Sequence, residues 1–535
     1  MRTTKMTKAI SKTRLLLVPM VAVALLLSAT AAFAAAPGIT GPTFNLTAQP
    51  AYTTQPDGNM VYSWGYGCNG APSGFAPPTI SGACSSMQVP GPTLIVTEGQ
   101  TVTVNLTNGL PTAAGNTSIL FPGFQVATTG GVAGLLTQEA APGGTVSYTF
   151  TASSPGTRAY YSGTQGDLQV EMGMYGAIIV LPSSVPSNCT SGLAAANVAV
   201  EQHWGELDFR LAPAAYDHAR SCYDREYLFQ FSEMDQNIHR QAEAQVLSAA
   251  KITACASGPA TPGCSLEVPT EPYHPTYFLI NGRSMPDDMD SNYAPEYPHQ
   301  PYNGNPHMHP GEQVLIRVIG QGRWQHPFHE HGNHVRILGR DGNLIVSQSD
   351  PNSLAGPLLF TTTTTPGLAF DGIFYWTGRG LNWDAYGHNP TSSDALATLP
   401  CNPDANGYNT GVAAQSQINY YEWCQDHNKP LQVAPFGDVA GGGPATLPDP
   451  NLFTNGPWYG GSPYLGPDAT IRSAGPTGST PPSGTIANPP QTEAGFAFMW
   501  HSHNEREITT DNAFPGGMLM MMLVDSREFV IDESN

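Results

Sequence analysis

The chain has 535 residues, of which 41 are acidic and 21 are Lys or Arg, so its formal net charge is −20. A chain this acidic is not expected to bind nucleic acid through phosphate neutralisation. Its length suits about two to four domains.

The first residues have the three parts of a secretory signal peptide. A basic start that includes Arg2 and Arg14 precedes an apolar run at residues 15–27, and Ala-Phe-Ala at 32–34 is a small-x-small cleavage site. The apolar run is short for a bilayer span, so we favour cleavage over a membrane anchor. We therefore expect residues 1–34 to be removed, no membrane span in the rest, and a secreted, periplasmic or cell-surface location.

Short alternating segments dominate the remaining chain. Residues 101–106 and 145–150 alternate apolar and polar side chains, and residues 176–180 form an apolar run. Short strands separated by Gly and Pro turn signals are typical of β-sandwiches. The one good helix candidate lies near residues 237–250. The sequence therefore predicts an all-β protein of tandem Greek-key β-sandwiches.

We place one β domain at residues 37–183, a linker or excursion at 184–225, and a second β domain at 226–525. The second domain contains a long insertion at about 387–495, which is dense in Gly, Pro, Asn and Ser. A structureless loop of this length is unusual inside a domain. We therefore expect an ordered insertion, with a surface lid as the alternative.

The even number of cysteines indicates disulfides, because an exported chain of this kind is exposed to oxidising conditions. Pairing of nearest neighbours would join Cys68 to Cys84, Cys189 to Cys222, Cys255 to Cys264, and Cys401 to Cys424. Other connectivities remain open. If all the cysteines pair, no thiolate is left for a metal.

Two pairs of histidines indicate a metal site. His329 and His331 are two residues apart, as are His501 and His503. Residues i and i+2 of a strand share a face, so four imidazoles converge if the two strands are neighbours. Imidazole is a good ligand for copper, zinc, iron or nickel. We favour metal binding over the alternative of solvent-facing or hydrogen-bonded histidines.

The remaining histidines carry weaker signals. His307 and His309 form a third such pair, but they lie in a Pro- and Asn-rich segment, so we interpret them as structural. Isolated histidines, among them His388 and His427, are interpreted as structural or exposed.

Three further side chains near the second pair could contribute ligands. Glu505 and Glu507 continue the alternation after His503 and would favour zinc, manganese or iron, whereas pairing with arginine or contact with water is the slightly favoured alternative. Met518 is a soft thioether that could serve copper as an axial ligand, although most of the Met-rich run 518–523 reads as core filling.

These segments resemble the multicopper oxidases in order as well as content. Residues 89–93 and 173–180 look like the opening and closing strands of that family's first cupredoxin domain. Residues 326–332 look like its HPxHxHG motif, and residues 500–503 look like its HCH motif. The resemblance implies tandem cupredoxin-like domains and covers most of residues 85–183, 310–345 and 496–524.

In this family, electrons enter at a type 1 copper held by two His, one Cys and usually a Met. They pass to a trinuclear copper cluster held by eight His, where oxygen becomes water. The resemblance makes His326 a type 1 ligand and Met518 the axial ligand, and it implies copper as the cofactor, with zinc or manganese as alternatives. Trinuclear positions are matched by His329, His331, His501 and His503.

Other ligand positions of the family are altered. Ser502 stands at the type 1 cysteine, and the second type 1 histidine falls near Glu507. A serine hydroxyl cannot replace the copper–thiolate bond, and half of the trinuclear ligand set is missing. The resemblance therefore implies the fold strongly and a laccase-type reaction weakly. The four histidine positions of the first domain are taken by Leu120, Pro122, Tyr161 and Gly163.

We therefore expect an exported metal-binding protein with copper, or another transition metal, at the histidines of the second domain; residual oxidoreductase activity is left open. The alternatives are a non-catalytic structural or assembly module and an active multicopper oxidase with an atypical ligand set. The sequence names neither catalytic residues nor a substrate. Two-domain members of the family often form trimers, so a homotrimer is a further expectation, and a third cupredoxin domain at about 190–300 is the alternative layout.

Overall fold

The structure is a computed structural model that describes residues 36–77, 83–192, 205–379 and 495–525, parts of 194–202 and 384–428, residues 461–464, and residue 531. The predicted signal peptide and most of the predicted insertion lie outside these residues. Among the described helices, none has the length and apolar character needed to cross a bilayer.

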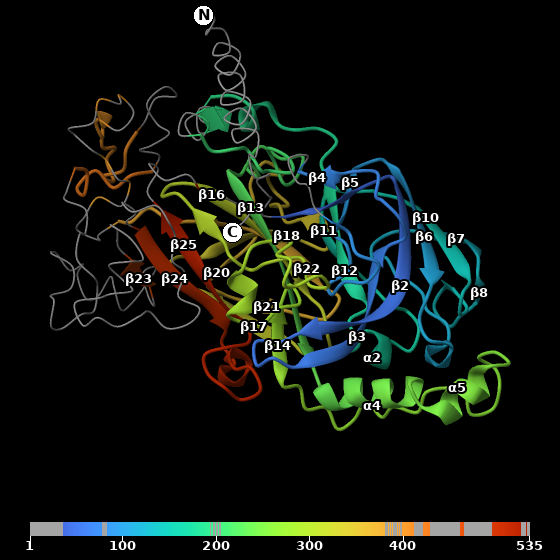
Figure 1. The fold of residues 1–535 in the computed structure, drawn as a ribbon. Coiled ribbons are helices and arrows are strands. Elements are labelled where there is room, and N and C mark those ends of the chain that lie inside the picture. Colours follow the sequence, from blue (N-terminus) through green and yellow to red (C-terminus); the bar gives the residue numbers. More distant parts are fainter. Residues whose placement is uncertain are drawn as a thin grey trace, which may run out of the picture.

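Strands dominate the described chain, and four of their sheets pack as two facing pairs (Figure 1). In the first pair, one sheet has the order β11-β12-β5-β1-β4 and the other has the order β3-β2-β6-β10-β7. Buried side chains of both sheets, including Trp64 and Tyr160, form one core between them. The strands are β1 (Gly38–Thr40), β2 (Thr43–Thr54), β3 (Met60–Cys68), β4 (Phe75–Ala76), β5 (Leu94–Thr97), β6 (Thr101–Asn108), β7 (Ala127–Gly130), β10 (Thr145–Thr151), β11 (Gly156–Tyr161) and β12 (Tyr175–Leu181), beside a small pair of β8 (Val132–Ala133) and β9 (Gln138–Glu139).

The second pair of sheets packs around a core rich in aromatic and methionine side chains, including Phe328, Trp500 and Met520. One sheet has the order β14-β13-β16-β22-β18-β19, with β20 paired to β18, and the other has the order β15-β25-β24-β17-β21, with β23 paired to β24. The strands are β13 (Arg225–Met234), β14 (Tyr277–Ile280), β15 (His307–Met308), β16 (Gln313–Gly320), β17 (His326–Glu330), β18 (Val335–Arg340), β19 (Asn343–Leu344), β20 (Leu358–Leu359), β21 (Thr361–Thr364), β22 (Ala369–Tyr375), β23 (Gly461–Tyr464), β24 (Gly495–Ser502) and β25 (Leu519–Asp525).

Alternation along the strands explains this packing. In β10, Val146, Tyr148 and Phe150 are buried while the residues between them are less so, as period-2 side-chain geometry requires. In the Met-rich strand β25, Met520 and Met522 enter the core. The predicted all-β fold of tandem cupredoxin-like β-sandwiches is confirmed.

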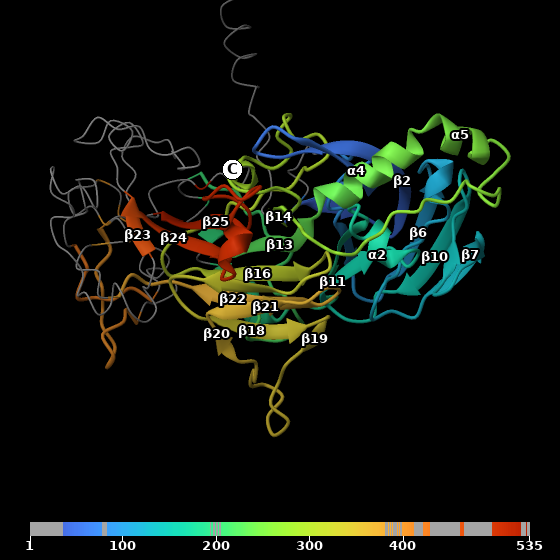
Figure 2. The ribbon, with the colours of Figure 1, turned by 90° about the horizontal axis from the view of Figure 1, so that it is seen from below.

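The two sandwiches lie side by side in both ribbon views (Figures 1 and 2). Their contact joins β11 of the first to the β13-β16-β22 sheet of the second, where the Thr157 hydroxyl donates to Asp371 at 2.6 Å and accepts from Arg317 at 3.2 Å. Apolar side chains from both sandwiches form a further cluster beside this network. The other sheet of the second sandwich, which contains β17 and β24, takes no part in this network.

Helices are few in the described chain. The helix expected near 237–250 is divided into α4 (Gln236–Val246) and α5 (Ala249–Cys255), because Ser248 caps the second helix by accepting from the Lys251 amide. His239 of α4 hydrogen-bonds the Tyr62 carbonyl oxygen at 2.6 Å, so the helix lies against the first sandwich (Figure 2). The shorter helices are α2 (Gly166–Gln169), η1 (Thr112–Ala114), η2 (Ser187–Cys189), η3 (Asp287–Met289) and η6 (Glu505–Ile508).

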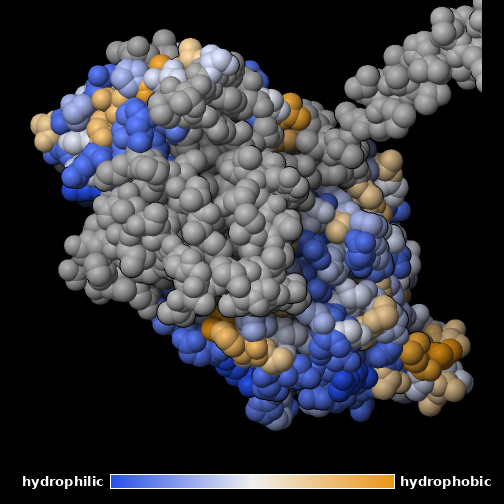
Figure 3. All heavy atoms as spheres, turned by 60° about the vertical axis from the view of Figure 1, so that its left-hand side comes forward, coloured by the Kyte–Doolittle hydropathy of each residue, from blue (hydrophilic) through white to orange (hydrophobic). Residues whose placement is uncertain are grey.

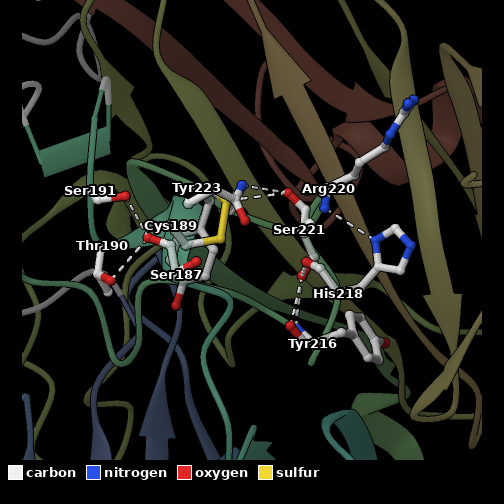
Figure 4. The surroundings of a disulfide bond; sticks show 12 residues. Ser187, Cys189, Thr190, Ser191, Tyr216, His218, Arg220, Ser221 and Tyr223 are labelled. Atoms are coloured by element: carbon white, nitrogen blue, oxygen red, sulfur yellow. Dashed lines mark hydrogen bonds between the residues drawn. A yellow bond between two sulfur atoms is a disulfide. The ribbon is translucent and has the colours of Figure 1, made fainter. Parts of the chain in front are cut away.

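All four disulfides expected from nearest-neighbour pairing are present. The Cys189–Cys222 disulfide cross-links the segment that connects the two sandwiches in the sequence. In the same segment, the Ser221 hydroxyl donates to the Tyr216 carbonyl oxygen (Figure 4). A cavity of about 830 Å³ lies beside this disulfide, and none of the predicted metal ligands lines it. With every cysteine oxidised, no thiolate remains to bind a metal.

The described surface seen in Figure 3 is largely hydrophilic, and hydrophobic residues gather there only in small, separate groups. This agrees with the acidic composition of the chain. The described part of this face therefore suits contact with water.

Candidate metal centre

The two predicted histidine strands are neighbours. β17 pairs with β24 in antiparallel fashion, and His329 lies opposite His501. Phe328 and Trp500, each one residue away, enter the core. Because alternate residues of a strand point to opposite faces, the two histidines lie on the outer face of this sheet.

The four outer-face imidazoles lie close together. Ring centroids are 4.6 Å apart for His329 and His331, 5.1 Å for His331 and His501, and 4.8 Å for His329 and His503. Nε2 of His331 lies 3.1 Å from Nε2 of His501. The side chain of His503 is 50% exposed, so this residue lies at the rim of the group. We call these four residues the histidine cluster.

Hydrogen bonds at Nδ1 orient two of these rings. Nδ1 of His501 donates to the Ser502 carbonyl oxygen at 2.7 Å, and Nδ1 of His329 is 2.6 Å from the Thr361 hydroxyl. Metal-bound histidines in proteins are held in this way, with the second nitrogen left for the metal. Both contacts therefore leave Nε2 to act as a ligand.

The electrostatics favour the neutral form of two rings of the cluster, His329 and His501. Burial, together with the neighbouring imidazoles, lowers the pKa of His329 to about 4. Burial also lowers the pKa of His501. A neutral imidazole has the lone pair that a metal requires, so at neutral pH both residues are in the ligating form.

The spacing of the Nε2 atoms of His331 and His501 fits one metal ion. Imidazole nitrogens lie about 2.0–2.1 Å from a bound zinc, so two ligands at a tetrahedral angle are about 3.3 Å apart. The 3.1 Å between Nε2 of His331 and Nε2 of His501 is close to this value. Among the described residues, no group that includes three of these histidines has all its ligand atoms within 4.8 Å of one another, so His329 and His503 would have to move to join an ion bound there.

The residues that match the type 1 copper site lie on the inner face of the same sheet. His326 is fully buried between two carboxylates, with Nδ1 2.9 Å from Glu507 and Nε2 3.0 Å from Glu233. The Ser502 hydroxyl donates to the same Glu507 carboxylate. Burial alone would lower the pKa of His326, but these two carboxylates raise it to about 9. An imidazolium bonded at both nitrogens has no lone pair for a metal, so this group does not fit a type 1 copper.

Met518 is also buried, in the core between the two sheets. Its amide donates to the Glu507 carbonyl oxygen at 2.8 Å, and its carbonyl oxygen accepts from the Ser502 amide at 3.0 Å. The structure thus brings His329, His331, His501 and His503 together, and it does not bring His326 or Met518 to them.

The altered positions of the first sandwich are filled by packing. Leu120 and Tyr161 exchange backbone hydrogen bonds of 2.8 and 3.3 Å. At Gly163, a Cβ atom would lie 2.8 Å from the Leu120 side chain. A histidine at either position would therefore need its neighbour to change as well.

His307 and His309, interpreted as structural, are both buried in hydrogen bonds. Nδ1 of His307 is 3.0 Å from Asp525, and Nε2 of His309 is 2.9 Å from Glu206. Neither residue is part of the histidine cluster.

A second group of possible metal ligands was missed by the sequence interpretation. Among the described residues, Asp384, His388, Glu422 and His427 form the one group of at least three His, Cys, Asp or Glu whose ligand atoms all lie within 4.8 Å of one another. His388 and His427 had been interpreted as isolated. The available signal was spacing, since each histidine follows a carboxylate by four or five residues and Cys424, which pairs with Cys401, lies between Glu422 and His427.

The fold defines the chain as a protein of tandem cupredoxin-like β-sandwiches. Residues 81–185 match the family model of multicopper oxidases. The predicted resemblance to this family is thus confirmed over these residues.

Other comparisons give distant matches. The multicopper oxidase mgLAC is 15% identical over 92% of this chain and 87% of its own, with a TM-score of 0.42. A blue copper oxidase from Nitrosomonas europaea is 14% identical over 90% of this chain and 85% of its own, with a TM-score of 0.42. A copper nitrite reductase from the same organism is 18% identical over 62% of this chain and 84% of its own, with a TM-score of 0.36. No curated protein matches the chain.

Proposed function

We propose that this is an exported metal-binding protein on a multicopper-oxidase scaffold, which holds one transition-metal ion in the histidine cluster. Copper is the expected metal, because imidazole suits it and the scaffold's relatives use it; zinc and manganese are the alternatives. Copper bound there would supply a one-electron centre open to small ligands. The ligands would be His331 and His501, completed by His329 and His503.

One observation carries this proposal: the 3.1 Å approach of Nε2 of His331 to Nε2 of His501. At this distance Nε2 of His331 can donate a hydrogen bond to Nε2 of His501; a cation that replaced the shared proton would be bound by both lone pairs. The Trp500 indole donates to the His331 carbonyl oxygen at 2.9 Å, which helps to hold this segment in place. The chain thus pre-organises the approach before any metal binds.

The buried group at His326 argues against an active multicopper oxidase. Electron transfer in that family needs the type 1 copper, and here the Ser502 hydroxyl and the Glu507 carboxylate fill its position. The proposed role is therefore metal binding, and the proposal includes no electron relay from an outside donor.

Metal analysis of the purified chain tests this proposal. We expect the copper-loaded protein to lose one equivalent of copper when His331→Ala and His501→Ala are combined, because two of its ligands are removed. His274→Ala is the matched control, since that imidazole is exposed and outside the cluster. Retention of all bound copper by the double variant would refute the assignment, and absence of copper from the wild-type chain would favour a non-catalytic module.

A further inference from the structure

The group of Asp384, His388, Glu422 and His427 lies in the region predicted as an insertion and is separate from the histidine cluster. We propose that these four side chains bind one divalent transition-metal ion, Zn²⁺ by preference, as a structural centre that joins two segments of the chain. This site does not depend on the function proposed above.

The geometry already brings the donors together. Nδ1 of His388 is 2.7 Å from the Asp384 carboxylate and 3.6 Å from the Glu422 carboxylate. Nδ1 of His427 is 2.8 Å from Glu422, and the two imidazole centroids are 4.4 Å apart. Tetrahedral zinc places its N and O donors about 3.3 Å apart, so movements of about 1 Å would admit an ion.

The burial of these charges calls for a cation. Asp384 is 1% exposed and Glu422 is 2% exposed. Burying two carboxylates is costly unless their charge is compensated. A divalent ion with two neutral imidazoles and two carboxylates gives a neutral site, whereas hydrogen bonds to neutral imidazoles alone leave the charge in place.

Two further observations point to a ligand. Oε2 of Glu422 is buried and has no hydrogen-bond partner among the described residues. A cavity of about 10 Å³, lined in part by Asp384, Glu422 and Asp426, lies beside it. A space of this size holds about one small species. An oxygen without a partner beside such a space is suited to a metal ion.

A disulfide and a hydrogen bond constrain the two segments that carry these ligands, residues 384–388 and 422–427. The Cys401–Cys424 disulfide fixes the chain two residues after Glu422. The Asn428 amide donates to Asp384 at 2.9 Å, which links the two ligand-bearing segments directly. A metal in this position would cross-link the segments further, as structural zinc sites do.

The donor set selects the metal. Two imidazoles with two carboxylates form a mixed N/O donor set that suits zinc, iron or manganese. Four protein donors with little space for water are typical of a closed structural zinc site. We therefore expect Zn²⁺ to bind more tightly here than Mn²⁺ or Mg²⁺.

The test uses the full mature chain after removal of metal with a chelator. Titration with Zn²⁺ alone should show a site that is lost in Asp384→Asn/Glu422→Gln, because neutral amides are weak ligands. Cobalt(II) loading is done in the His331→Ala/His501→Ala background, where the histidine cluster lacks two ligands; it should give tetrahedral visible absorption that disappears when Asp384→Asn/Glu422→Gln is added. The His274→Ala chain is the control and should keep both signals.

A second variant, His388→Ala/His427→Ala, guards against misfolding of the first; each variant is checked by circular dichroism. Full zinc stoichiometry in either folded double variant would overturn the proposal, as would failure of the wild-type chain to bind Zn²⁺ at this site. Loss of copper in His331→Ala/His501→Ala, with this zinc site retained, would show that the two sites are independent. If only the histidine cluster fails to bind metal, this inference still stands.

Discussion

At the scale of single residues, the site that would accept electrons in a multicopper oxidase is a buried hydrogen-bonded group. Glu507 contacts both His326 and Ser502. Glu233 holds the other side of the imidazole and also accepts from the Arg323 amide at 2.7 Å. The exchange of Cys for Ser was visible in the sequence. The partnership with Glu233, which is 93 residues away, was not, because no local pattern specifies a contact of that range.

The charged group of Glu233, His326 and Glu507 should make the stability of the fold depend on pH. Because the pKa of His326 is raised to about 9 in the folded chain, the imidazolium stabilises the fold fully below about pH 6.5, the pKa of an unfolded histidine, and this contribution disappears as the pH rises through 9. The free energy of unfolding should fall by about 3 kcal/mol over that window. In His326→Gln this part of the pH dependence should be absent.

Urea unfolding at several pH values between 6 and 10 measures the effect. His274→Gln, an exposed histidine, should keep the wild-type slope. A slope in His326→Gln as steep as in the wild type would show that the Glu233–His326–Glu507 group does not carry the predicted charge.

At the scale of elements, side chains alternate between the two faces of the sheet along β17 and β24. The histidines of the cluster and the residues at the type 1 position therefore lie on opposite faces. His329 and His501 lie on the outer face of the sheet, and His326 and Ser502 lie on the inner face. The i and i+2 spacing predicted the outer set, because that spacing alone fixes the face. The spacing could not predict that β21 pairs with β17, because that pairing depends on the tertiary fold.

The hydroxyl of Thr361 on β21 is expected to position His329. Thr361→Val should weaken copper binding about tenfold, because it removes the hydrogen bond that orients the ring and leaves every ligand in place. Thr363→Val is the matched control, since Thr363 lies two residues farther along the same strand and is exposed.

Isothermal titration of the metal-free chain with Cu²⁺ compares the two variants. Equal affinities would mean that the hydrogen bond to Thr361 has no positioning role. A loss of binding in both variants would instead point to damage to β21 itself.

At the scale of the whole molecule, strand alternation was sufficient to predict the tandem β-sandwiches and sequence proximity was sufficient to predict the disulfides. The group around Asp384 and Glu422 was missed because its ligands come from two segments that are far apart in the sequence. The domain boundaries at 183 and 226 and the homotrimer stay predictions, as does the signal peptide at residues 1–34.

A crystal structure of the copper-loaded protein, with anomalous diffraction at the copper edge, tests most directly whether the histidine cluster binds copper. We expect an anomalous peak between Nε2 of His331 and Nε2 of His501, and none beside His326 and Ser502. A peak between His326 and Ser502, or no copper at the histidine cluster, would contradict this expectation.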